Sequence, residues 1–175
     1  CDTDIARRAM PDVPLPSRFR HPADVEAQLA AAASYHERLF GRRPSGLWPS
    51  EGSVCPEIVP LVARQGFKWM ASDEEVLFRS IRSRDRYTVL YRPYLVEHAG
   101  ATVGMVFRDR QLSDLIGFTY AFNDPKSAVA DFLMKLSEIA RVARGDDAIV
   151  SVILDGENPW QSYPDGGEGF LRRLY

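Results

Sequence analysis

Residues 124–155 read DPKSAVADFLMKLSEIARVARGDDAIVSVILD, a helix pattern followed directly by a strand pattern. Asp124 stands before Pro125, apolar residues then recur at helical spacing, and Gly145 follows the basic end. These features are the start, the apolar face and the stop of a helix. The next run, AIVSVIL (148–154), is apolar and rich in β-branched residues, which predicts a strand covered on both faces.

The same alternation of helix and strand extends through most of the chain. The alanine-rich residues 22–40, closed by Gly41, predict a helix, and residues 67–75 (FKWMASDEE) predict a buried strand that ends in acidic residues. Residues 87–109 contain two β-rich runs separated by EHAGA, which predicts a hairpin or at least two neighbouring strands. This order favours an α/β architecture with mainly parallel strands, in one domain over residues 1–175.

The composition excludes several classes of protein. An apolar content of 45% with 26% charged residues is ordinary for a globular domain. The net charge of −2 and the scattered Lys and Arg residues argue against a nucleic-acid partner, and no apolar run is long enough to cross a membrane. Cys1 and Cys55 cannot form a disulfide framework, so we expect a reducing compartment, the cytoplasm.

Four carboxylates follow apolar runs in the sequence: Glu51, Asp73, Asp109 and Asp155. In parallel α/β proteins the C-terminal ends of the strands face a common mouth where ligands bind. The alternative for each carboxylate is that it caps the following helix or ends a strand in water.

That alternative is strongest for two of the four. Asp73 is followed by two further acidic residues, a pattern that begins a helix. Asp109 lies between Arg108 and Arg110, so an ion-paired structural role is as consistent with the pattern as contact with a substrate.

Glu51 and Asp155 have similar neighbours. Trp48 precedes Glu51 by three residues, and Trp160 follows Asp155 in the stretch LDGENPW. Tryptophan offers an apolar ring on which a sugar can stack. Two carboxylates are also the minimum for cleaving a glycosidic bond, because one protonates the leaving oxygen while the other acts as nucleophile or base.

Metal and cofactor motifs are missing from the sequence. His21, His36 and His98 show neither HxxxH nor HExxH spacing, and neither a GxSxG elbow nor a Walker phosphate loop occurs. We therefore expect no metal and no cofactor.

The stretches GLWPSEGSV (46–54) and ILDGENPW (153–160) resemble two motifs of glycoside hydrolase family 57. Residues 69–77, 91–94 and 107–120 are similar to segments of the amylopullulanase-like branch of that family. The resemblance runs from about Pro14 to the C-terminus.

The resemblance implies an incomplete (β/α)7 barrel acting on α-glucans with retention, as a hydrolase or transglycosidase. Glu51 matches the nucleophile and Asp155 the general acid/base of the family. The predicted substrate-binding residues are Trp48, Asp73, Arg108, Asp109, Glu157 and Trp160.

The motifs that the family carries before the nucleophile and after the acid/base are missing here. We therefore expect a fragment of a larger barrel that lacks both ends, has weak activity by itself, and can self-associate through an exposed barrel edge. Two alternatives stay open: a non-catalytic carbohydrate-binding domain, and a metal-dependent sugar deacetylase.

Overall fold

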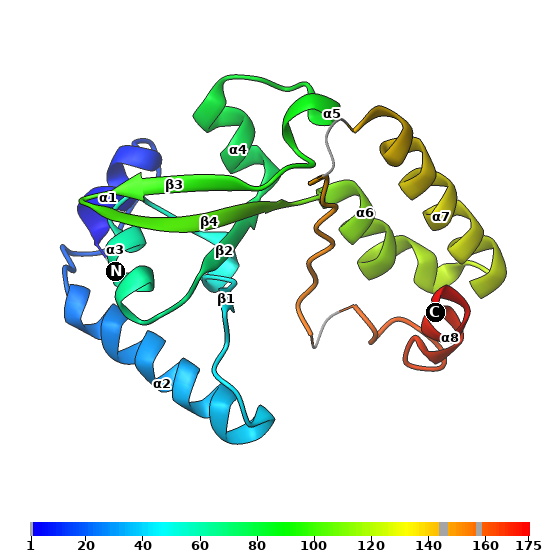
Figure 1. Ribbon diagram of the computed structural model, residues 1–175, viewed down its shortest axis with the longest axis horizontal. Coiled ribbons are helices and arrows are strands. Elements are labelled where there is room, and N and C mark those ends of the chain that lie inside the picture. Colours follow the sequence, from blue (N-terminus) through cyan, green and yellow to red (C-terminus); the bar gives the residue numbers. More distant parts are fainter. Residues whose placement is uncertain (1, 144–146, 157–158) are drawn as a thin grey trace. The chain divides into compact units, whose positions relative to one another are not determined.

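The computed structural model describes residues 2–143, 147–156 and 159–175. Contacts divide the chain into two compact units. The first comprises Cys1–Ala71 and Tyr94–Met105, and the second comprises Ser72–Pro93 and Val106–Tyr175 (Figure 1).

The helices of the first unit precede and follow its shortest strand. They are α1 (Thr3–Ala9), α2 (Pro22–Phe40), the 3-10 turn η1 (Ser50–Gly52) and α3 (Ile58–Arg64). The helix predicted over residues 22–40 is confirmed as α2, with Pro22 in its first turn and Gly41 as its left-handed cap.

Over the residues that the structure describes, the sheet has four strands in the order β1-β2-β4-β3. Strand β1 (Gly46–Leu47) is parallel to β2 (Trp69–Asp73), with Gly46 opposite Trp69. Met70 and Ala71 of β2 are buried, as expected for a strand in the core. The strand predicted within residues 67–75 is therefore confirmed.

Strands β3 (Tyr94–His98) and β4 (Ala101–Arg108) form the predicted hairpin. They are antiparallel, and Ala99 and Gly100 connect them with φ values of 50° and 76°. Two consecutive residues with positive φ make the tight turn whose twist matches that of the strands. The sheet is thus mixed, and the predicted α/β class is confirmed.

The second unit is mainly helical. Its elements are α4 (Glu74–Ile81), α5 (Arg86–Val89), α6 (Arg110–Asp114), the π-helical turn η2 (Leu115–Thr119), the 3-10 turn η3 (Tyr120–Phe122), α7 (Pro125–Val142) and α8 (Glu168–Leu174).

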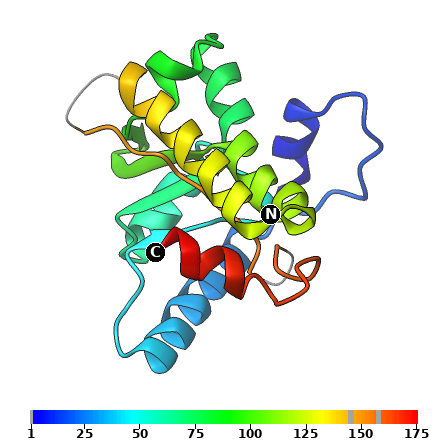
Figure 2. The same ribbon diagram turned by 90° about the vertical axis from the view of Figure 1, so that its right-hand side faces the viewer.

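Helix α7 begins as the sequence predicts and packs against α8. The Asp124 side chain accepts a hydrogen bond from the amide of Ser127, which caps the helix. The rings of Phe132 and Phe170 lie 6.3 Å apart, edge to face, and Phe170 is fully buried. Figure 2 shows α7 in yellow beside α8 in red. The predicted stop at Gly145 lies outside the described residues.

The strand predicted over residues 148–154 is wrong in its extent. The segment has a single parallel bridge, between Ser151 and Arg108 at the end of β4. Residues 151–154 are half-buried rather than covered on both faces. The main-chain groups of Ile153 bind side chains instead of a neighbouring strand, so no regular ladder forms.

None of the helices within the described residues is both long and apolar enough to span a membrane.

Candidate active site

Glu51 lies on the 3-10 turn η1 of the first unit, four residues beyond the end of β1. Its side chain is exposed, and its backbone has φ 56° and ψ 22°. This left-handed conformation is uncommon for a residue with a side chain and is held only where the surrounding structure enforces it.

Trp48 and Gly52 enforce this turn. Gly52 is buried with φ 63°, and a Cβ atom added there would lie 2.8 Å from the Trp48 indole. The amide of Gly52 also donates a hydrogen bond to the carbonyl of Pro49 at 2.9 Å. The half-buried Trp48 ring therefore packs over the backbone next to Glu51, and only glycine fits under it.

Asp155 lies at the end of the extended segment 148–154 in the second unit, and it is exposed. Glu51 belongs to the first unit. Glu157, predicted to bind substrate, lies outside the described residues.

Trp160 is half-buried in the turns that follow Asp155. Its ring centroid lies 5.5 Å from that of Tyr163, and a Cβ atom on Gly167 would meet the indole at 2.3 Å. One face of Trp160 is thus covered by the protein itself, at Tyr163 and Gly167.

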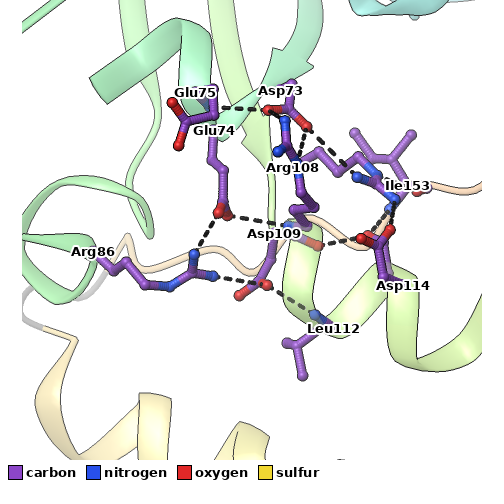
Figure 3. A network of polar contacts seen from close by, with 11 residues as sticks. Asp73, Glu74, Glu75, Arg86, Arg108, Asp109, Leu112, Asp114 and Ile153 are labelled. Carbon is purple, nitrogen blue, oxygen red and sulfur yellow. Dashed lines mark hydrogen bonds and ion pairs between the residues drawn. The ribbon is translucent and has the colours of Figure 1, made fainter. Parts of the chain in front are cut away.

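Asp73 caps helix α4, as the alternative interpretation of its sequence predicts. It accepts a hydrogen bond from the amide of Glu75 at 3.0 Å, and it pairs with Arg110 at 2.5 Å and Arg108 at 3.5 Å (Figure 3). Burial opposes ionisation, but the hydrogen bonds from Arg110 and Glu75 outweigh it and lower the pKa of Asp73.

Two buried carboxylates share one guanidinium in the second unit. Glu74 Oε1 accepts from Arg86 Nη1 at 2.5 Å, and Asp109 Oδ1 lies 2.9 Å from Arg86 Nη2 as an ion pair. Glu74 Oε2 accepts from the amide of Arg110 at 3.1 Å. Glu74 is 6% and Asp109 1% exposed, so both charges depend on these partners.

Asp109 is further bound by its own helix and by a tyrosine. Its Oδ1 accepts from the amide of Leu112 at 2.9 Å, which caps α6, and its Oδ2 accepts from the hydroxyl of Tyr91 at 2.8 Å. Burial and the nearby carboxylate raise the pKa of Tyr91. The ion-paired structural role considered for Asp109 is thus what its contacts support.

Arg108 is predicted to bind substrate, but each of its guanidinium nitrogens contacts another group of the protein. Nη2 donates to Asp114 Oδ1 at 2.6 Å, Nη1 lies 3.5 Å from Asp73, and Nε donates to the main-chain carbonyl of Ile153 at 2.9 Å. The side chain is 17% exposed.

A pocket of about 530 Å3 opens between α5, α6, η2 and α7 in the second unit. Buried Tyr91 and Asp109 and half-buried Arg86 contribute its polar lining, and Leu112 and Ile139 contribute apolar lining. Of the predicted site residues that the structure describes, Asp109 is the one that lines it.

Five residues of this polar network are not marked by any pattern in the sequence: Glu74, Arg86, Tyr91, Ser113 and Asp114. Glu74 and Arg86 begin helices, Tyr91 lies in a loop, and Ser113 and Asp114 end α6, so they are connected only through the fold. Within the described ranges, no group of three His, Cys, Asp or Glu residues is placed to hold a metal ion.

The sequence profile of glycosyl hydrolase family 57 matches residues 13–175. The chain belongs to this family. The match covers both motifs, so Glu51 and Asp155 lie inside the family region.

A solved structure has a fold similar to that of this chain. The crystal structure of 4-α-glucanotransferase from Thermococcus litoralis matches with a TM-score of 0.67 at 22% sequence identity. The match covers 85% of this chain and 22% of the other, so this chain spans about a fifth of that protein. No curated protein matches the sequence.

Proposed function

We propose that this family 57 chain carries the two catalytic carboxylates of a retaining enzyme that acts on α-glucans with α-1,4 or α-1,6 linkages. Glu51 is the nucleophile and Asp155 the general acid/base. The observation that carries the proposal is the turn of Glu51, where Trp48 and Gly52 hold an exposed carboxylate on a left-handed backbone.

In the first step, the Glu51 carboxylate attacks the anomeric carbon while the bond to the glycosidic oxygen breaks. Asp155 gives its proton to that oxygen, so the leaving chain departs as a neutral alcohol. The product is a glycosyl ester on Glu51 and an ionised Asp155. The transition state has oxocarbenium character, which the carboxylate of Glu51 stabilises.

In the second step, Asp155 takes a proton from water or from a sugar hydroxyl. The resulting oxygen nucleophile attacks the anomeric carbon and frees Glu51. Water gives hydrolysis, and a glucan hydroxyl gives transfer. This chemistry needs the two carboxyl groups roughly 5 to 5.5 Å apart, which is the spacing expected in the assembled barrel.

Three further observations support the proposal. The chain belongs to a glycosyl hydrolase family, its fold is similar to that of a 4-α-glucanotransferase, and the side chains of Glu51 and Asp155 are both exposed to solvent. A (β/α)7 barrel completed by segments outside this chain is part of the proposal, because the chain spans 22% of that relative.

The test replaces Glu51 by Gln and Asp155 by Asn in the full-length protein, with Glu57→Gln as the matched control. Glu57 lies on the same segment, six residues after Glu51, and its carboxylate pairs with Arg8 at 2.9 Å. Release of reducing ends and transfer products from amylose and pullulan should fall at least about 10⁴-fold for Glu51→Gln and stay unchanged for Glu57→Gln.

A covalent label gives an independent reading. A 5-fluoro-α-glucosyl fluoride should leave a fluoroglucosyl ester on the peptide that contains Glu51, seen by mass spectrometry. Full activity of Glu51→Gln, or an ester on another carboxylate, would contradict the assignment of Glu51 as the nucleophile.

A further inference from the structure

The main chain of Ile153 is bound on both sides by side chains. Its carbonyl accepts a hydrogen bond from Nε of Arg108 at 2.9 Å, and its amide donates to Oγ of Ser113 at 3.2 Å. A strand in a sheet would satisfy these groups with the backbone of a neighbour. Here two side chains take that place, two residues before Asp155.

Both anchoring side chains are themselves held. Arg108 is fixed by Asp114 at 2.6 Å and by Asp73 at 3.5 Å (Figure 3). Ser113 is fully buried and donates its hydroxyl to the carbonyl of Asp109 at 2.6 Å. The anchors therefore have little freedom to move with the segment they bind.

The bonds of this segment fall on alternate residues. The amide of Ile149 donates to the carbonyl of Tyr91 at 3.2 Å, and the carbonyl of Ser151 accepts from the amide of Asp109 at 2.8 Å. Ile153 follows with its two side-chain partners. These alternate residues hold one edge of an extended chain in place. Ile153 is the hydrogen-bonded residue of this series that lies nearest to Asp155.

We propose that Arg108 and Ser113 are positioning residues for Asp155. Their hydrogen bonds to the main chain of Ile153 hold the general acid/base in the position and orientation that proton transfer requires. The inference rests on the proposed function of Asp155. It gives Arg108 a role through the backbone in place of the direct sugar contact predicted from the sequence. A displacement of about 1 Å in a catalytic group can cost about 10²-fold in rate.

The first test uses the dependence on the leaving group. Arg108→Met and Ser113→Ala are made in the full-length protein and assayed with aryl α-maltosides. An alkyl-like or weakly acidic leaving group needs the proton from Asp155, whereas dinitrophenolate departs without it. We expect kcat/KM to fall about 10²-fold for the poor leaving group and less than about 3-fold for the dinitrophenyl substrate.

The matched control is Arg110→Gln. Arg110 pairs with Asp73 as Arg108 does, but its side chain makes no described contact with residues 149–153. It should leave both rates unchanged. Arg108→Lys, which can still donate one bond, should recover part of the loss. An equal fall for both substrates in Arg108→Met and Ser113→Ala would overturn the inference, because it would report general damage to the fold.

The second test needs no activity. Amide hydrogen exchange at Ile153 and the residues after it should accelerate at least about tenfold in Ser113→Ala, while exchange in helix α7 stays as in the unchanged protein. Unaltered exchange at Ile153 would show that Ser113 does not hold the segment. Retained activity of Asp155→Asn would instead contradict the proposed function. The exchange measurement would still show whether Ser113 holds the segment at Ile153.

Discussion

Nη2 of Arg86 lies 2.9 Å from Oδ1 of Asp109, a carboxylate that is 1% exposed. The same guanidinium donates from Nη1 to Glu74, so two buried carboxylates, which follow β2 and β4, share one cation. Burial opposes the charge on Arg86, but the hydrogen bond with Glu74 and the charge of Asp109 outweigh it and raise its pKa.

Replacing Arg86 by Met should destabilise the protein by about 3–5 kcal/mol, because it leaves Glu74 and Asp109 buried without their cation. Urea unfolding at neutral pH measures the loss. Arg84→Met is the control, since Arg84 pairs with Glu75 at 3.6 Å but is 76% exposed, and its loss should stay below about 1 kcal/mol. Equal losses for the two variants would contradict the view that Arg86 holds the buried pair.

Gly52→Ala should disturb the Glu51 turn more than its backbone angle alone explains. Gly52 and Gly41 have similar positive φ values of 63° and 72°, but only at Gly52 would a Cβ atom meet another group, the Trp48 ring at 2.8 Å. We expect Gly41→Ala to cost about 1 kcal/mol and Gly52→Ala about 1–3 kcal/mol more. Thermal unfolding compares the two, and a change in Trp48 fluorescence should accompany only Gly52→Ala.

Asp73→Asn should destabilise the protein at pH 7 by about 1 kcal/mol, since the ion pairs with Arg108 and Arg110 are partly exposed. The pKa of Asp73 is lowered on folding, so its contribution is complete above the ordinary aspartate pKa of about 3.9 and is lost as the pH falls further through the lowered value.

The difference between Asp73→Asn and the unchanged protein should therefore be constant above about pH 5 and vanish in stronger acid. Urea unfolding at several pH values traces this curve. Asp12→Asn, at an exposed position, is the control and should show no such difference. A gap that persists at pH 2 would mean that the effect of Asp73 does not depend on its charge.

Elements with a strong local signal were predictable from the sequence. Helix α2 is marked by its alanine content and by Pro22 and Gly41, and α7 by Asp124 and Pro125; each begins where these residues indicate. The hairpin of β3 and β4 follows from two β-rich runs on either side of the EHAGA stretch that contains Ala99 and Gly100. In each case the information lies within a few neighbouring residues.

The segment 148–154 shows where this approach fails. Its β-branched composition indicates a strand, but whether a ladder forms depends on which partners the fold places beside it. Here the partners of Ile153 are two side chains, from Arg108 and Ser113, about forty residues earlier in the chain. No local pattern encodes such a pairing.

For the candidate site, the sequence identified the motifs around Glu51 and Asp155 but not the residues that support them. Trp48 was predicted as a sugar platform, and the structure adds that its ring covers Gly52. Arg86 was not noticed at all, because an arginine in an Arg-rich loop has no distinguishing mark. Supporting residues of this kind are recognisable only from three-dimensional contacts.

The left-handed backbone of Glu51 also bears on how the sequence was selected. At φ 56° and ψ 22°, glycine or asparagine would fit with less strain, by about 1 kcal/mol. A chain optimised for stability alone would therefore hold a different residue at position 51. The glutamate at position 51 therefore lowers the stability of the fold. A screen for more stable variants should return substitutions that remove this side chain.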